Sequence, residues 1–257
     1  MSSNAASPLG LPSDEEIGTL MRVFENDLAV LEGEFGQNVA TVTDIYLLIA
    51  RVHIRSYHWL RSTSSEDKRS GLLRSYTAAS SLITGCLAYD DASGILAYSP
   101  NILQRVIFHA AYIVFKTFNS SLRQFINLDD AATLIQKAQA LLHRVSAAPN
   151  DLPIRASNIL ADIWKHRDDD LSERLRDPEL SFPSHLTLSL TYDAAWRWQM
   201  QRARLTGDSI NNNGSTTARN GSHDPPSLPQ ELATPATFNW DLFDDLDWNL
   251  ACDDAVL

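Results

Sequence analysis

The stretch NILQRVIFHAAYIVFKTFNSSL, residues 101 to 122, constrains the fold more than any other part of the sequence. Its only charged residues are Arg105 and Lys116. A helix with so few polar positions is stable only when other elements surround it. Its longest apolar run covers residues 106 to 115, about half of the roughly twenty residues that a membrane span needs. The stretch therefore predicts the central helix of a protein core, and no membrane association is expected.

Helical spacing recurs on both sides of this segment. Ser13 and Glu16 have the spacing of a capping box, which opens a helix. The apolar residues that follow them recur every three or four positions, as expected for one helix face: Ile17, Leu20, Met21, Phe24, Leu28 and Leu31. Further helices are predicted over about residues 40–60, 72–91, 128–148 and 151–171. Only residues 185–192 alternate like a strand, and that segment could equally begin a helix. The fold class is therefore all-α, a multi-helix, bundle-like domain.

Composition divides the chain into four parts. Residues 1–12 are small, polar and contain proline, so this N-terminus is expected to be disordered. Residues 13–204 form the predicted helical domain. Residues 205–233 are rich in Gly, Ser, Asn, Thr and Pro, which is typical of a flexible linker. Residues 234–257 are acidic and aromatic, and we expect this tail to be tethered to the helical domain, with folding back onto it as a terminal helix the alternative.

Charge is concentrated at the C-terminus. From Asp224 to Leu257 there are eight acidic residues and no Lys or Arg, so this part supplies −8 of the formal net charge of −11. The rest of the chain is nearly neutral and lacks the basic stripe that binds phosphate backbones. Direct binding of nucleic acid by this chain is not expected. The first sixteen residues lack the pattern of a secretory signal, and two distant cysteines, Cys86 and Cys252, suit a reducing compartment.

Residue patterns that carry chemistry are scarce, and no cofactor, metal or catalytic residue is predicted. The nearest approach to the metal-binding motif of prenyl-diphosphate enzymes is Asp169, Asp170 and Glu173, which a solvated turn explains better. His109 lies in the most apolar segment and is expected to be a hydrogen-bonded core residue. Cys86 is expected to be a small buried residue rather than a catalytic thiol. A helical prenyl-diphosphate-type enzyme and a non-regulatory interaction protein remain the alternative functions.

Several short motifs resemble the regulatory region of fungal binuclear zinc-cluster transcription factors. The similarity covers about residues 14–204, and the sequence elements that carry it are Ser99-Pro100, Lys116 with Asn119-Ser120-Ser121, the predicted helix 131–145, and Tyr192-Asp193 followed by Trp196 and Trp198. In that family such motifs belong to the helix-rich middle homology region. The resemblance implies a transcription regulator that is not an enzyme and that acts in the nucleus, with a protein shared between cytoplasm and nucleus as the alternative. For the two tryptophans we expect inward packing, with a ligand cage as the alternative.

The resemblance also implies roles for the tail and for partners. The family's six-cysteine zinc cluster does not occur in this sequence, which leaves open an upstream DNA-binding region, a paralogue that lost it, or pairing with an intact zinc-cluster factor. Members of the family commonly end in an acidic transactivation tail. Here repulsion between the aspartates would keep the tail's large apolar side chains exposed for a coactivator groove. The predicted partner-binding residues are Phe238, Trp240, Leu242, Phe243, Leu246 and Trp248.

Overall fold

The computed structural model describes residues 13–35, 42–61, 66–94, 96–149, 151–168, 176, 178–181 and 189–211. The chain divides after Arg202 into two units, and the contacts described below all belong to the first unit. Within the described ranges every regular element is a helix and none is a strand. The all-α fold class is therefore confirmed.

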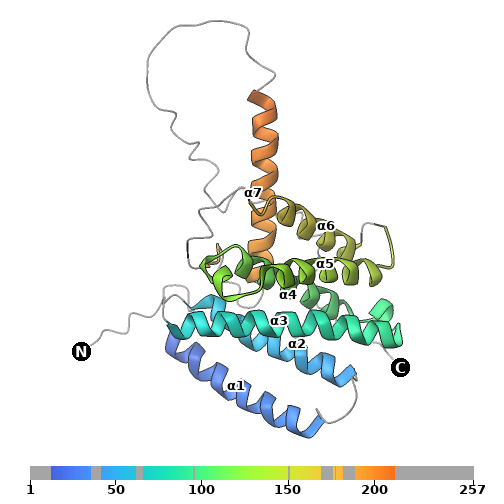
Figure 1. Cartoon of the computed structure of the whole chain (residues 1–257). Helices are drawn as coiled ribbons and strands as arrows, with labels where there is room; N and C mark the ends of the chain where they lie inside the picture. Colours follow the sequence, from blue (N-terminus) through green and yellow to red (C-terminus); the bar gives the residue numbers. More distant parts are fainter. Residues whose placement is uncertain are drawn as a thin grey trace, which may run out of the picture. The chain divides into compact units, whose positions relative to one another are not determined.

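The described residues form α-helices and a few short 3-10 turns (Figure 1). The α-helices are α1 (Asp14–Phe35), α2 (Val42–Ser56), α3 (Glu66–Ser93), α4 (Asn101–Phe118), α5 (Leu128–Arg144), α6 (Leu152–Lys165) and α7 (Ser189–Asn211). The 3-10 turns are η1 (Tyr57–Leu60), η2 (Leu96–Tyr98) and η3 (Ser121–Phe125). Helices that follow one another in sequence from α1 to α6 largely pack side by side, and α1 packs mainly on α2.

Capping side chains define where several helices begin. At α1 the predicted capping box is present: the Glu16 backbone N–H donates to Ser13 Oγ at 3.3 Å, and the Ser13 backbone N–H donates to the Glu16 carboxylate at 2.7 Å. At α6, Asp151 accepts from the Ile154 backbone N–H at 3.2 Å. Each bond satisfies a backbone group that the first helical turn leaves without an intrahelical partner. The local sequence therefore fixes these helix starts.

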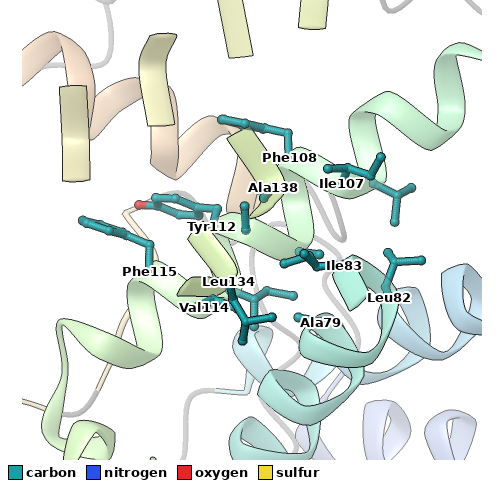
Figure 2. Close-up of a cluster of buried hydrophobic side chains, with 14 of the residues drawn as sticks. Ala79, Leu82, Ile83, Ile107, Phe108, Tyr112, Val114, Phe115, Leu134 and Ala138 are labelled. Carbon is teal, nitrogen blue, oxygen red and sulfur yellow. The ribbon is translucent and has the colours of Figure 1, made fainter. Parts of the chain in front are cut away.

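Helix α4 is the central helix of the core, as its sequence predicts. Fourteen of its residues are buried, including Ile107, Tyr112 and Phe115. Side chains from the neighbouring helices α3 and α5 pack around it, among them Leu82 and Leu134 (Figure 2). Burying a large apolar side chain contributes about 1.5–3 kcal/mol, so the cluster around α4 supplies the main driving force for folding.

Two helix boundaries differ from the sequence-based predictions. Helix α3 begins at Glu66, inside a segment that polar composition assigns to a loop, because Glu66 and Asp67 suit the positive end of a helix dipole. Helix α7 begins at Ser189, so the described part of the ambiguous segment 185–192 is helical. It then continues to Asn211, past the predicted start of the linker at residue 205. Extending an existing helix costs less than starting one, which explains how polar residues join its end.

The first prediction concerns two glycines in helices. A methyl group added at Gly71 would lie 2.1 Å from His58 Nδ1 and 2.4 Å from His58 Cγ, whereas at Gly18 it would meet no atom within 4 Å. We expect Gly71→Ala to lower the free energy of unfolding by about 1–3 kcal/mol, because the buried imidazole ring must move. The matched Gly18→Ala variant should gain up to about 1 kcal/mol from helix propensity. Urea unfolding of both variants measures the difference, and equal effects would contradict the tight packing of His58 on α3.

Candidate functional site

A buried ion pair joins α4 to α7 through residues that the family resemblance singles out. Asp193, 3% exposed, accepts from the Lys116 ammonium and from the Tyr112 hydroxyl, the latter at 2.7 Å. Its second oxygen accepts the Ser181 backbone N–H at 2.7 Å. Three donors therefore surround one carboxylate, and they come from α4 and from the segment before α7.

The groups around Asp193 keep its carboxylate charged although the side chain is buried. Burial by itself raises the pKa of Asp193, but the Lys116 charge, the Ser181 N–H and the Tyr112 hydroxyl more than offset it. The net pKa lies below the usual value for an aspartate. A carboxylate that accepts several hydrogen bonds in its charged form stays ionised. Asp193 is therefore an anion at neutral pH with a structural role.

The Lys-Asn-Ser-Ser motif fixes the chain after α4. Lys116 also donates to the Glu179 carbonyl oxygen, and the Ser121 backbone N–H donates to the Arg176 carbonyl oxygen at 2.9 Å. Ser120 Oγ accepts from the Leu122 backbone N–H at 3.3 Å and so caps η3. The motif thereby ties the end of α4 to the segment that precedes α7.

The two tryptophans of α7 are both half-buried. Trp198 packs against the core, and its indole N–H donates to Asp162 Oδ2 on α6 at 2.9 Å. Between the tryptophans, the Arg197 guanidinium lies 5.0 Å from the centre of the Phe115 ring. Inward packing is thus confirmed for Trp198, whose hydrogen bond joins α7 to α6.

Buried histidines form a second polar group, on α2 and α4. His109 Nε2 and Ser56 Oγ are 2.8 Å apart, and Ser56 Oγ donates its own hydrogen to the Val52 carbonyl at 2.7 Å. The imidazole proton must then lie on Nε2, because the hydroxyl can only accept from it. A serine activated for nucleophilic attack donates to its histidine, which is the opposite arrangement. The pair therefore satisfies buried polar atoms, as predicted for His109.

Burial sets the protonation states of this region. It lowers the pKa of His109 to about 3, with a smaller contribution from the nearby His53 ring. It also lowers the pKa of His58 to about 4, helped by the charges of Arg74, Arg61 and Arg55. Burial of Cys86, with a contribution from Asp90, raises the pKa of its thiol to about 12. The thiol is therefore protonated and unsuited to nucleophilic attack. The expected structural role of Cys86 agrees with its complete burial.

Comparison with known proteins gives two significant similarities. The chain is 26% identical over 188 residues to "Regulatory protein LEU3" of Saccharomyces cerevisiae, a match that covers 64% of this chain and 21% of that protein. It is 26% identical over 225 residues to "Putative transcription factor SEF1" of Eremothecium gossypii, covering 82% of this chain and 21% of that protein. The chain is similar to fungal transcription regulators. It spans about a fifth of the length of these curated relatives.

Other comparisons add no family assignment. No family profile matches the sequence, and no solved structure matches it significantly. The similarity to the two fungal regulators supports a fungal transcription factor and a role in transcription regulation, as the motifs around Lys116 and Asp193 predict. Because one relative is named as a regulatory protein and the other as a putative transcription factor, the comparison also favours a protein that is not an enzyme.

The other residues singled out in the sequence lie beyond the described part of the structure. These are the tail residues Phe238, Trp240, Leu242, Phe243, Leu246 and Trp248, and the possible metal ligands Asp169, Asp170 and Glu173. Within the described ranges, His, Cys, Asp and Glu side chains form no group of three or more that could hold a metal ion. No helix in those ranges is long and apolar enough to cross a membrane.

Some contacts were not predicted from the sequence. The bonds of Asp193 to Tyr112 and Ser181, and the Trp198–Asp162 bond, join residues too far apart in the chain for spacing to indicate. A signal did exist for the ion pair, since a lysine in the most apolar helix needs a partner of opposite charge when it is buried. Lys116 is the one lysine in the most apolar helix, and Asp193 starts an otherwise uncharged turn.

Proposed function

We propose that this chain is the regulatory part of a fungal transcription regulator, in which a helical body carries an acidic tail that recruits a coactivator. The observation that carries the proposal is the similarity of the chain to two fungal regulators over most of its length. A regulator of this kind acts in the nucleus, and we expect the chain there.

The described body supports this proposal by what its buried polar groups do. Asp193 and Lys116 hold α4 against the start of α7, and His109 and Ser56 satisfy each other within the core. These groups are saturated by structural contacts and are protonated in ways that suit packing rather than acid–base chemistry. The body is therefore suited to be a rigid platform for protein contacts.

The tail supplies the proposed contact with a coactivator. Between Phe238 and Trp248, large apolar side chains alternate with aspartates, and the whole tail lacks lysine and arginine. Like charges resist collapse, so the aromatic side chains remain available to a partner. A groove lined with apolar and basic side chains would bind them as a short amphipathic helix, at spacings such as Phe238, Leu242 and Leu246.

The proposal places DNA recognition outside this sequence. The body has a nearly neutral formal charge, and the sequence has too few cysteines for the family's zinc cluster. We propose that the chain reaches its target genes through an intact zinc-cluster factor or through a region that this sequence does not contain. Loss of reporter activity after removal of that factor, with the chain still expressed, would support the first arrangement.

The second prediction tests the tail. We fuse the full chain to an unrelated DNA-binding domain and measure a reporter gene. We expect the triple variant Trp240→Ala, Phe243→Ala and Trp248→Ala to abolish activation, because these side chains supply most of the contact area for a groove. The thermal unfolding midpoint of the body should not change, since the tail is tethered to the body and not packed in it.

A matched control keeps this experiment specific. The control variant replaces the exposed body residues Tyr98, Ile102 and Phe125 by alanine, and it should activate the reporter like the parent chain. Equal loss of reporter activity in the tail variant and the control variant would mean that activation depends on exposed apolar side chains wherever they lie in the chain, and not on the tail in particular. A tail variant that lowers the unfolding midpoint would show instead that the tail is packed on the body, as an interaction protein with a docked tail would require.

A further inference from the structure

Helix α1 uses only part of its apolar surface to attach to the body. Ile17, Met21 and Leu28 are buried, and they lie along one side of the helix. At the edge of this contact, Glu32 pairs with Arg51 of α2, and Glu25 pairs with Arg55 of α2 at 3.3 Å. Figure 1 shows α1 along the outer edge of the helical body, beside α2. The side of α1 that packs on α2 is therefore occupied by buried apolar residues and edged by ion pairs, and the remaining surface of α1 faces outward.

The side next to this contact is apolar and exposed. Leu20, Phe24 and Leu31 are 52%, 50% and 43% exposed. At about 100° per residue they lie within about 40° of one another around the helix axis. Val23 and Val30, also exposed, continue the same surface further from α2. Single exposed apolar residues are ordinary, but five on one helix form a patch of the kind that marks an interaction site.

Acidic residues run through this patch. By the same helical geometry Asp27 and Glu34 project between the leucine–phenylalanine row and the two valines. Neither has a cationic partner among the described residues, in contrast to Glu25 and Glu32. Over its whole length α1 carries seven acidic residues and one basic residue, Arg22. The exposed face of α1 is thus an apolar surface in a strongly negative field.

Charge selects among the possible occupants of this face. A second copy of the chain would place α1 against α1 and bring two sets of acidic side chains together. The tail of this chain is also strongly acidic and would be repelled in the same way. A helix with an apolar stripe flanked by lysine or arginine would bury the exposed leucines and phenylalanine while neutralising Asp27 and Glu34.

We propose that the exposed face of α1 binds a basic amphipathic helix of a partner protein. Leu20, Phe24 and Leu31 are its central apolar contacts, because these large exposed side chains form one row between the buried side of α1 and the two valines. Asp27 and Glu34 set the preference for a basic partner. The site does not depend on the tail, so this proposal and the proposed coactivator contact succeed or fail separately.

The third prediction uses a synthetic probe against the full chain. The probe is an eighteen-residue helical peptide of leucine and lysine, with leucines on one face, and its counterpart carries glutamate in place of lysine. We expect the lysine peptide to bind and to slow hydrogen exchange of α1 amides, and the glutamate peptide not to bind. In the variant Leu20→Asn, Phe24→Asn and Leu31→Asn, affinity for the lysine peptide should fall at least about tenfold, because the apolar contacts are lost.

Two further variants make the result decisive. The control variant Tyr98→Asn, Ile102→Asn and Phe125→Asn changes exposed apolar residues outside α1 and keeps the acidic tail. It should bind the lysine peptide with the same affinity as the parent chain. The charge variant Asp27→Lys and Glu34→Lys leaves the apolar contacts and should reverse the preference toward the glutamate peptide. If the unfolding midpoint shows that the asparagine variant does not fold, this charge variant still tests the proposal.

Three results would overturn the proposal. The first is binding of both peptides alike, which would mean that the patch takes any amphipathic helix. The second is binding that the α1 variants leave unchanged, which would place the lysine peptide on the tail. The third is a chain that is dimeric by sedimentation and becomes monomeric in the asparagine variant, which would make a second copy the occupant.

Discussion

Replacing Asp193 by alanine should lower the free energy of unfolding by about 3–5 kcal/mol, the usual cost of removing one partner of a buried ion pair. The variant leaves the ammonium of Lys116, whose side chain is 13% exposed, without its carboxylate and removes the acceptor for Tyr112 and for the Ser181 N–H. Equilibrium unfolding in urea measures the change. We expect hydrogen exchange to rise first in α7, because Asp193 is its main polar contact with α4.

Matched variants separate burial from charge. Arg144 forms ion pairs with Asp90 and Asp91 at 3.0 and 2.7 Å, but its side chain is nearly half exposed. Arg144→Ala should therefore cost at most about 1 kcal/mol. The double variant Lys116→Met and Asp193→Leu should recover much of the loss, since it removes both buried charges. If Asp193→Ala lowers the free energy of unfolding no more than Arg144→Ala does, this result would contradict the structural role of the ion pair.

Lowering the pH from 7 to 5 should destabilise the fold by about 4 kcal/mol, roughly 2 kcal/mol for each of two buried histidines. His109 and His58 have pKa values of about 3 and 4 in the folded chain, whereas an unfolded histidine titrates near pH 6.5. The unfolded chain therefore binds more protons between pH 6.5 and 4, and stability falls as the pH falls through this window. His53, whose pKa is also lowered by burial, contributes in the same direction.

Carboxylates do not obscure this window. The pKa values of Asp151 and Asp193 lie below the usual value of 3.8, so their stabilising effect is lost only at still lower pH. Urea midpoints at pH 7, 6 and 5 measure the slope.

Single replacements assign the pH effect to particular rings. Neither ring nitrogen of His58 has a hydrogen-bond partner among the described residues, so His58→Phe removes a titrating group without breaking a hydrogen bond. We expect that variant to show a slope smaller by about half, whatever stability it loses at pH 7 because the phenyl ring is larger than the imidazole ring beside Gly71. A parent chain with no slope between pH 7 and 5 would contradict the burial of both rings.

Local signals predicted most of the fold. The Ser13–Glu16 capping box opens α1 as expected, and α5 has Asp129 and Asp130 in its first turn and Arg144 in its last. The scarcity of charge between residues 101 and 122 identified the central helix. These features depend on interactions within one helix or on a single helix being surrounded, and both are visible in sequence.

What sequence alone could not provide is the choice among equivalent apolar faces. Periodicity treats Leu20, Phe24 and Leu31 as equal to Ile17, Met21 and Leu28, but α2 covers only the second set. Which half of a wide stripe is buried depends on the crossing of two helices, and that depends on all the side chains at the contact. The pairing of Lys116 with Asp193 likewise depends on how the chain returns to α4. The roles assigned to Phe238, Trp240 and Trp248 remain predictions.

The order in which the helices pack has a consequence for how this protein is made. From α1 to α6, helices largely pack against their neighbours along the chain, so most of the body needs only short loops to close. Each helix can therefore dock soon after it leaves the ribosome, before the rest of the chain exists. Asp193 cannot meet Lys116 until 77 further residues have been synthesised. Until then Lys116 lacks its carboxylate, so α4 completes its polar contacts only after the first turns of α7 have been synthesised.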